Sequence, residues 1–230
     1  MPQLQALVFD AYGTLYDVHS VSARAETLFP GHGAALSQLW RSKQLEYSWL
    51  RSLMGTYADF NQVTAAALRY AIAALKLDAD AAAVTALLGQ YVHLSPYPEV
   101  AAALTQLKPG RKLAILSNGA PDTLEALVNN SGLAPRFDAV LSVDSVGIFK
   151  PDMRIYRLAE ERLGELHPGL ARRHIGFVSS NCWDAIGAAT YGYTVFWVNR
   201  LGAPVDLHGR APDHIISSLD QLAPLLEAAP

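Results

Sequence analysis

The stretch LVFDAYGTLYD, residues 7–17, decides the fold, because an apolar run of strand length ends there in an aspartate and a glycine turn. The run begins at Leu4 and is nearly continuous in hydrophobicity, which is typical of a strand buried on both faces of a parallel sheet. Asp10 follows directly. Because ligands of open parallel sheets bind beyond the carboxyl ends of the strands, this position also predicts a functional site.

Five further apolar runs predict the rest of the sheet. They lie at residues 112–117, 139–143, 175–179, 194–198 and, more weakly, 214–216. Stretches with helical spacing and helix start and stop signals separate several of them, at residues 121–131, 155–163 and 183–191. Strands that alternate with helices predict an α/β fold, a doubly wound parallel (Rossmann-like) sheet.

Residues 17–95 interrupt this alternation, because they contain no strand-like run. Instead, apolar residues recur at helical spacing in three stretches, at residues 36–50, 63–74 and 79–91. The segment SPYP, residues 95–98, resists helix formation and predicts the linker back to the sheet. We therefore expect an α/β core domain of residues 1–16 and 96–230 and an inserted helical cap domain of residues 17–95.

Composition limits the class of function. Of the 230 residues, 51% are hydrophobic and only 17% are charged, which excludes wholesale disorder. The net charge of −3 gives no electrostatic footprint for nucleic acid or for an anionic membrane, so neither is an expected partner. Cys182 is the single cysteine, cannot form an internal disulfide, and fits a cytoplasmic location.

Polar side chains of complementary chemistry follow four of the predicted strands. Besides Asp10, they include residues 117–118, Lys150 in the turn GIFKP, and residues 179–181 with Asp184 one turn later. A lone Asp, Ser or Asn after a strand is usually a turn or helix-cap residue. Two carboxylates, an ammonium, hydroxyls and amides at one edge of a sheet instead predict an active site.

In this order, LVFDAYGTLYD, SNG, GIFKPD and FVSSNCWD resemble the motifs of the haloacid dehalogenase superfamily, and within it the (S)-2-haloacid dehalogenases. The resemblance covers essentially the whole chain, including the helical insertion, which corresponds to the cap of that family. It implies hydrolysis of short (S)-2-haloalkanoic acids to (R)-2-hydroxy acids and halide. It also implies a homodimer.

Two alternatives stand beside this interpretation. Phosphatases of the superfamily use an Asp-x-Asp pair and a Gly-Asp-x-x-x-Asp motif to bind Mg²⁺, but here the second acid is replaced by Tyr12 and the first acid of the later motif by Ser180. A hard cation prefers carboxylate oxygens, so a Mg²⁺-dependent phosphatase is the weaker hypothesis, and we expect neither metal nor cofactor. A non-catalytic binding protein of the same fold is the second alternative.

The resemblance implies a role for each polar position in the reaction. Asp10 would be the nucleophile that forms an ester with C2 of the substrate, and Lys150 would supply the positive charge that favours its ionised form. Asp184 would activate the water that hydrolyses the ester, while Ser179 and Asn181 hold the geometry.

The resemblance also implies how substrate and halide bind. Arg41, from the insertion, would accept the halide together with Asn118, although an arbitrary helix arginine is more often a solvated charge. The backbone N–H groups of Ala11 and Tyr12, with Ser117 and Asn118, would bind the substrate carboxylate.

The remaining candidates are supporting and wall residues. Thr14 and Tyr156 would support the nucleophile loop and Lys150, although core packing alone also explains Tyr156. Apolar walls would exclude water, and the candidates by resemblance are Tyr12, Leu45, Phe60 and Trp183. Ordinary core packing explains Leu45 and Phe60 equally well.

Overall fold

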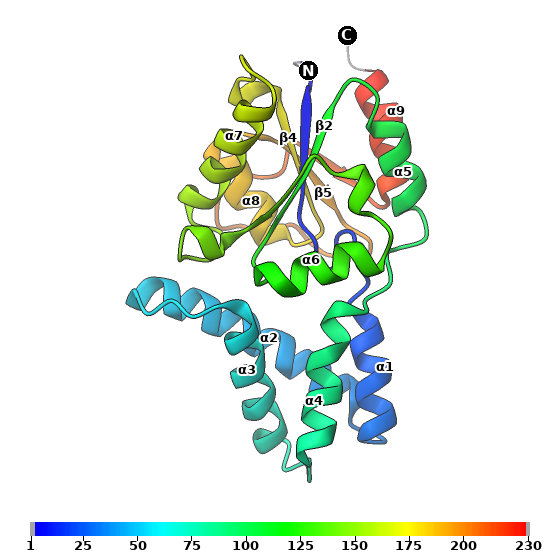
Figure 1. Ribbon diagram of the computed structural model, residues 1–230, viewed down its shortest axis with the longest axis vertical. Helices are drawn as coiled ribbons and strands as arrows, with labels where there is room; N and C mark the ends of the chain where they lie inside the picture. The colour runs from blue at the N-terminus through cyan, green and yellow to red at the C-terminus, as the bar shows by residue number, and fades with distance from the viewer. Residues whose placement is uncertain (1–2, 229–230) are drawn as a thin grey trace.

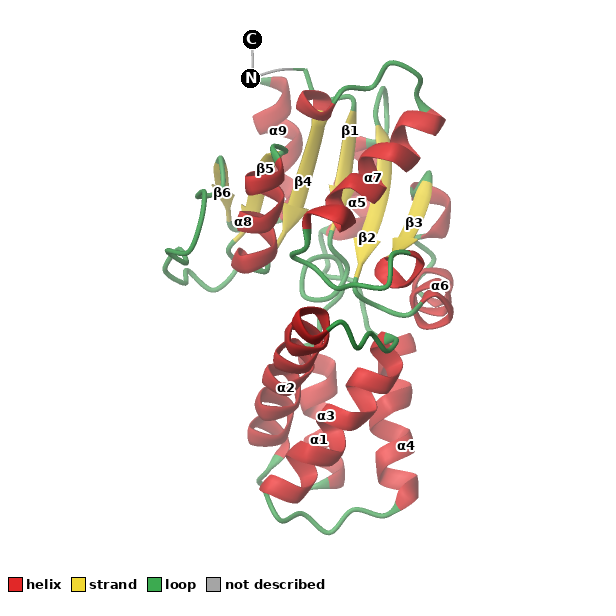
Figure 2. Cartoon of the chain, turned by 90° about the vertical axis from the view of Figure 1, so that its left-hand side faces the viewer, coloured by secondary structure: helices red, strands yellow, loops and turns green. Residues whose placement is uncertain are grey.

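A single parallel sheet organises the computed structural model, which describes residues 3–228 (Figures 1 and 2). Its strands lie in the order β3-β2-β1-β4-β5-β6. The strands are β1 Ala6–Phe9, β2 Lys112–Ser117, β3 Ala139–Ser142, β4 Ile175–Ser179, β5 Thr194–Val198 and β6 His214–Ile216. The order reverses at β1, which pairs with β2 on one side and β4 on the other, so the carboxyl end of β1 lies at the switch point where ligands bind.

Alternate side chains of β1 explain why helices cover both faces. Leu7 and Phe9 belong to one core cluster, and Ala6 and Val8 belong to another, each fully buried. The first cluster includes residues of α5 Val100–Leu107, α6 Pro121–Asn130 and α9 Leu222–Glu227. The second includes residues of α7 Met153–Leu166 and α8 Cys182–Tyr191. The predicted doubly wound α/β fold is therefore confirmed.

The helices inserted between β1 and β2 lie together beyond the carboxyl ends of the strands (Figures 1 and 2). They are α1 His19–Leu28, α2 Gly33–Met54, α3 Phe60–Ala74 and α4 Ala81–Gly89, whereas α5, which also precedes β2, packs on the sheet. Trp40 of α2 is buried among them, and its indole N–H donates to the Thr64 carbonyl of α3 at 2.9 Å. Their placement is the one that a cap requires, and the division into two domains stays a prediction.

Several element boundaries differ from the sequence-based predictions. The first strand begins at Ala6 rather than Leu4, and β3 ends at Ser142 rather than Val143. Helix α7 exceeds the predicted range 155–163 at both ends, because Asp152 caps it through the Arg154 N–H. Helix α1 is absent from those predictions, since its sequence carries no strong apolar stripe.

The predicted apolar stripe of α2 is wrong at its carboxyl end. Leu50 is exposed, and the next helical turn leaves Leu53 84% exposed. The last turns of α2 pack on the core instead of on the other inserted helices: Ser52 Oγ accepts the Phe149 N–H at 3.2 Å, and Trp49 meets Trp183 edge to face. Within residues 3–228, no helix is long and apolar enough to cross a membrane.

Candidate active site

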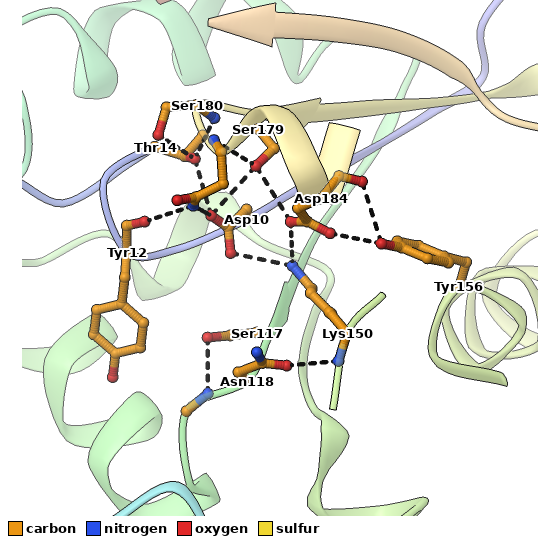
Figure 3. A network of polar contacts seen from close by, with 12 residues as sticks. Asp10, Tyr12, Thr14, Ser117, Asn118, Lys150, Tyr156, Ser179, Ser180 and Asp184 are labelled. Carbon is orange, nitrogen blue, oxygen red and sulfur yellow. Dashed lines mark hydrogen bonds and ion pairs between the residues drawn. The ribbon is translucent and has the colours of Figure 1, made fainter. Parts of the chain in front are cut away.

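Asp10 is the centre of the polar network at the carboxyl edge of the sheet (Figure 3). It follows β1 and is only 6% exposed. Its Oδ2 accepts hydrogen bonds from Asn181 Nδ2 at 2.8 Å and from Thr14 Oγ1 at 3.1 Å. Its Oδ1 is 3.1 Å from Lys150 Nζ. One carboxylate oxygen is thus held by hydrogen bonds, while the other, among the described residues, meets only the ammonium group of Lys150.

Lys150 joins the two buried carboxylates of the site. Its Nζ lies 2.8 Å from Asp184 Oδ2 in addition to its contact with Asp10, and its side chain is 1% exposed. Burial by itself would lower the pKa of Lys150, but the charges of Asp10 and Asp184 raise it above its ordinary value. The lysine therefore remains an ammonium ion. Its backbone N–H donates to Asn118 Oδ1 at 3.0 Å, which fixes the turn that carries it.

Asp184 lies in the first turn of α8 and is fully buried. Burial raises the pKa of Asp184 to about 6, and Lys150 opposes that rise. Tyr156 donates its hydroxyl to Asp184 Oδ1 at 2.8 Å, and Ser179 donates to Oδ2 at 3.2 Å. Burial also raises the pKa of Tyr156, so the phenol stays protonated as a donor. Tyr156 is thus both a core residue and a partner of the acid.

The segments that follow β1 and β2 present unused donors next to Asp10. The backbone N–H groups of Ala11 and Tyr12 have no hydrogen-bond partner among residues 3–228. Asn118 uses its Oδ1 to hold Lys150, and no partner within the described chain engages its Nδ2. Ser117 is buried, and its Oγ accepts the Gly119 N–H at 3.1 Å. Its own hydroxyl proton has no acceptor within the described chain. These donors are suited to an anion.

The inserted helices contribute an aromatic wall. The Tyr12 ring stacks on Phe60, with ring centroids 6.4 Å apart, and meets Tyr91 edge to face at 5.8 Å. A cavity of about 220 Å³ adjoins these rings and is also lined by Thr64 and Leu88. The predicted wall therefore gains Tyr91, which the sequence analysis missed because it ends an Ala- and Leu-rich stretch that has the character of ordinary core.

Arg41 lies on α2 near this wall. Burial raises the pKa values of Tyr12 and Tyr91, and the positive charge of Arg41 opposes the rise at both. No described residue forms an ion pair or hydrogen bond with Arg41. Its charge is therefore available to an anion. Leu45 lies one turn later on α2 and is partly buried; it does not line the cavity beside Tyr12.

Trp183 lies on a different side of the network from Tyr12. Its ring centroid is 5.4 Å from that of Trp49, and both line a groove of about 830 Å³ that also includes Lys150. The structure thus gathers Asp10, Thr14, Lys150, Tyr156, Ser179, Asn181 and Asp184 in one hydrogen-bonded network. The sequence analysis gave Ser180 no role, yet its N–H donates to Thr14 Oγ1 at 2.8 Å.

A metal ion would require a suitable set of ligands. Within residues 3–228, no three His, Cys, Asp or Glu side chains are grouped so that they could hold one. The positive charge between Asp10 and Asp184 is instead the ammonium of Lys150.

Comparisons with known proteins agree with this arrangement. Residues 4–192 match the family model of haloacid dehalogenase-like hydrolases. The chain is 48% identical over 230 residues to the (S)-2-haloacid dehalogenase of Pseudomonas sp. (strain YL), covering 100% of this chain and 97% of that protein. The crystal structure of an L-2-haloacid dehalogenase matches with a TM-score of 0.94 at 45% identity, over 98% of this chain and 100% of that one. A structure of the L-2-haloacid dehalogenase from Xanthobacter autotrophicus with chloropropionic acid covalently bound matches with a TM-score of 0.91 at 42% identity, over 99% and 100% of the two chains.

Proposed function

This chain belongs to the family of haloacid dehalogenase-like hydrolases, and on that premise we propose that it hydrolyses short (S)-2-haloalkanoic acids to (R)-2-hydroxy acids and halide. The observation that carries the proposal is the state of Asp10: a buried carboxylate held at Oδ2 by hydrogen-bond donors and facing an ammonium at Oδ1. A covalent complex with chloropropionic acid in a structure 42% identical to this chain supports an ester intermediate.

In the first step, Asp10 attacks C2 of the substrate in line with the carbon–halogen bond. The new C–O bond forms as the halide departs with the bonding electron pair, so the configuration at C2 inverts. Oδ1 is the better candidate for the attacking oxygen, because Asn181, Thr14 and, at 3.4 Å, Ser179 already donate to Oδ2. Burial strengthens this step, since few water molecules then solvate the carboxylate.

The departing halide and the substrate carboxylate are both anions, and each needs donors. Arg41 has no ion-pair partner within the described chain, which supports its role as the halide acceptor. Asn118 Nδ2 is the second donor for the halide. The backbone N–H groups of Ala11 and Tyr12, with the Ser117 hydroxyl, are the donors for the substrate carboxylate.

In the second step, water attacks the carbonyl carbon of the Asp10 ester. Asp184 takes a proton from that water through Oδ2, the oxygen on the side of Asp10, because Lys150 and Ser179 contact both this oxygen and the Asp10 carboxylate. Its Oδ1 is turned toward the Tyr156 hydroxyl. The tetrahedral intermediate collapses and expels the product alkoxide, which takes the proton back from Asp184, and the (R)-2-hydroxy acid leaves. One proton is released to solvent as Asp10 returns to the carboxylate. Ser179 lies 3.4 Å from Asp10 Oδ2 and 3.2 Å from Asp184 Oδ2, which supports its role in aligning the two acids.

The test is chloride release from separate (S)- and (R)-2-chloropropionate in buffer that contains EDTA. Release from the (S) form alone is expected, with D-lactate as the product. Release from neither form, together with Mg²⁺-dependent hydrolysis of phosphate monoesters, would replace this proposal with the phosphatase alternative. If no haloacid is hydrolysed and none changes the melting temperature, the chain is a non-catalytic member of the fold.

We also propose the core of residues 1–16 and 96–230, the cap of residues 17–95, a homodimer and a cytoplasmic location. Leu53 and Met54 at the end of α2 are 84% and 65% exposed, which supports a contact between subunits there. Cys182 is a free cysteine, in keeping with a reducing compartment. Sedimentation of the wild-type protein and of Leu53→Glu tests the contact, because only the variant is expected to be monomeric.

A further inference from the structure

The chain enters and leaves the inserted helices through two strand-like linkers that lie side by side. Tyr16 and Pro96 form an antiparallel bridge. On either side of it, the Asp17 N–H donates to the Ser95 carbonyl at 2.8 Å and the Tyr97 N–H donates to the Leu15 carbonyl at 3.0 Å. Any movement of the inserted helices relative to the sheet must pass through this pair of linkers.

Arg200, in the segment after β5, binds both linkers at once. Its Nη1 lies 2.6 Å from Glu99 Oε1, and its guanidinium carbon lies 3.8 Å from the centre of the Tyr97 ring. Its Nη2 donates to the Thr14 carbonyl at 3.1 Å. The side chain is 17% exposed, so this is not a solvated surface charge. One planar group therefore holds the return linker and the turn that follows Asp10.

The contact with Thr14 leads directly to the nucleophile. Thr14 Oγ1 is 3.1 Å from Asp10 Oδ2 and accepts the Ser180 N–H at 2.8 Å. A shift of the Thr14 backbone would move this hydroxyl and change the orientation of the Asp10 carboxylate. Effective in-line attack needs that orientation, and misplacement by about 1 Å can cost roughly 100-fold in rate.

We propose that Arg200 is a positioning residue, which holds the turn at Thr14 and the linker at residues 97–99 in register and thereby orients Asp10 for attack. The inference rests on the proposed function. An arginine is required because stacking on Tyr97, pairing with Glu99 and donation to Thr14 use different parts of one planar fork. A lysine can replace the charge but not the three contacts together.

The chain offers a matched control at the other end of the sheet. Arg172, which precedes β4, also pairs with a glutamate, stacks on a tyrosine ring at 4.0 Å and donates to a backbone carbonyl. It contacts neither linker. Arg172→Met removes the same kinds of interaction as Arg200→Met. A difference in activity between the two variants therefore reports the contact of Arg200 with the linkers rather than the general loss of an arginine.

The experiment measures kcat, KM and the single-turnover rate of ester formation on (S)-2-chloropropionate for Arg200→Met, Arg200→Lys, Glu99→Gln and Arg172→Met. We expect kcat and ester formation to fall about 10- to 100-fold in both Arg200 variants while KM changes less than about threefold. Glu99→Gln, which keeps the bond to Thr14, and Arg172→Met are expected to stay within about threefold of wild type. Arg200→Lys keeps a cation beside Glu99, so it supplies folded protein if Arg200→Met is unstable.

A second measurement does not depend on activity. Hydrogen exchange of the Asp17 and Tyr97 amides is expected to accelerate in the Arg200 variants and not in Arg172→Met. Wild-type rates of ester formation in the Arg200 variants, or equal losses in Arg172→Met, would overturn the proposal. If the wild-type protein releases no chloride, the proposed function fails, and unchanged exchange at the two amides would then separately reject the coupling of the linkers.

Discussion

Around Asp10, the core contributes charged side chains that form ion pairs and hydrogen bonds with one another. The inserted helices instead contribute aromatic rings and the charge of Arg41, which has no ion-pair partner within the described chain. Asp10, Lys150 and Asp184 form a buried chain of ion pairs at 3.1 and 2.8 Å. Across the site, Tyr91 and Phe60 pack on Tyr12, and Arg41 has no ion-pair partner within residues 3–228.

This difference separates two tasks. A nucleophile must keep one orientation, and buried ion pairs with full hydrogen bonding hold it there at little cost in reorganisation. An acceptor for a departing halide must instead leave its charge free until the anion arrives. We therefore expect substitutions in the core to abolish chemistry or change its pH dependence, and substitutions in the inserted helices to weaken catalysis while leaving stability unchanged.

The largest expected effect is that of Asp10→Asn, which removes the nucleophilic charge from the core. Turnover should fall by roughly 10⁴-fold or more, as for other nucleophile replacements. Lys150 keeps its partner Asp184 at 2.8 Å, so the variant should remain folded. Chloride release and far-ultraviolet circular dichroism measure the two quantities. Mass spectrometry must exclude deamidation back to aspartate, and a full rate from the intact Asp10→Asn variant would contradict the assigned nucleophile.

Arg41→Met tests the contribution of the inserted helices to catalysis. Loss of the halide acceptor should lower kcat about 10²- to 10³-fold, the range seen when one donor to a developing anion is removed. Because the guanidinium has no ion-pair partner in the described chain, the melting temperature should not fall. Arg51→Met, further along α2, is the control, since its guanidinium donates to the Thr56 carbonyl rather than facing the site. Equal losses in both variants would favour a general role for helix charge.

The sequence predicted the residues of the core site better than the packing of the inserted helices. The strand ends and their polar residues follow from continuous apolar runs, and parallel pairing brings these ends to one edge of the sheet. The closeness of Lys150 to Asp10 and Asp184 was expected from the family resemblance. The packing of α2 was not predictable in the same way, because Leu50 and Leu53 have apolar character but are exposed. Their burial depends on what each turn of the helix meets, which periodicity does not encode.

Side-chain contacts between distant segments account for the other omissions. Arg200 lies in an ordinary loop sequence, and only the fold brings it to Thr14 and Glu99. Gly187 has the character of an ordinary helix residue, although a Cβ at that position would collide with the Tyr156 hydroxyl. The local sequence around Gly187 does not indicate that the Tyr156 hydroxyl occupies the space a side chain would fill.

Tyr156→Phe should change the pH dependence of the core network. Asp184 must be ionised to accept a proton from the water that hydrolyses the ester, so the rate of ester hydrolysis falls as pH drops through the pKa of Asp184, which burial raises to about 6. The Tyr156 hydrogen bond favours the ionised form, and its loss should raise that pKa further, moving the acid limb to higher pH by about one unit. With the pKa moved from about 6 to about 7, the rate of ester hydrolysis at pH 6 should fall roughly fivefold, with little change at about pH 9.

Gly187→Ala should produce a shift in the same direction, because the added methyl group displaces the Tyr156 hydroxyl that it would otherwise overlap. Tyr16→Phe is the control, since that tyrosine is also buried but bonds to Ser131 Oγ at 2.9 Å. The comparison is of complete pH profiles of the single-turnover rate of ester hydrolysis. An acid limb that stays in place in Tyr156→Phe would mean that Asp184 is not the base.

The smallest expected effect is at one of the contacts between the inserted helices and the core. Tyr57, in the segment between α2 and α3, donates its hydroxyl to Asp144 Oδ1 of the core at 2.9 Å. Burial and the Asp144 charge raise the pKa of Tyr57, so it remains a donor at every pH of interest. Tyr57→Phe loses one hydrogen bond, worth about 1 kcal/mol, and should raise KM about two- to fivefold with kcat nearly unchanged.

Tyr70→Phe is the matched control for this last variant, because Tyr70 is an exposed tyrosine of α3. The ratio of the two KM values for (S)-2-chloropropionate isolates the contact with Asp144. If Tyr57→Phe instead lowers kcat as strongly as Arg41→Met, then closure of the inserted helices on the core limits the chemical step. The unpaired charge of Arg41 would then be delivered by that closure rather than held permanently in place.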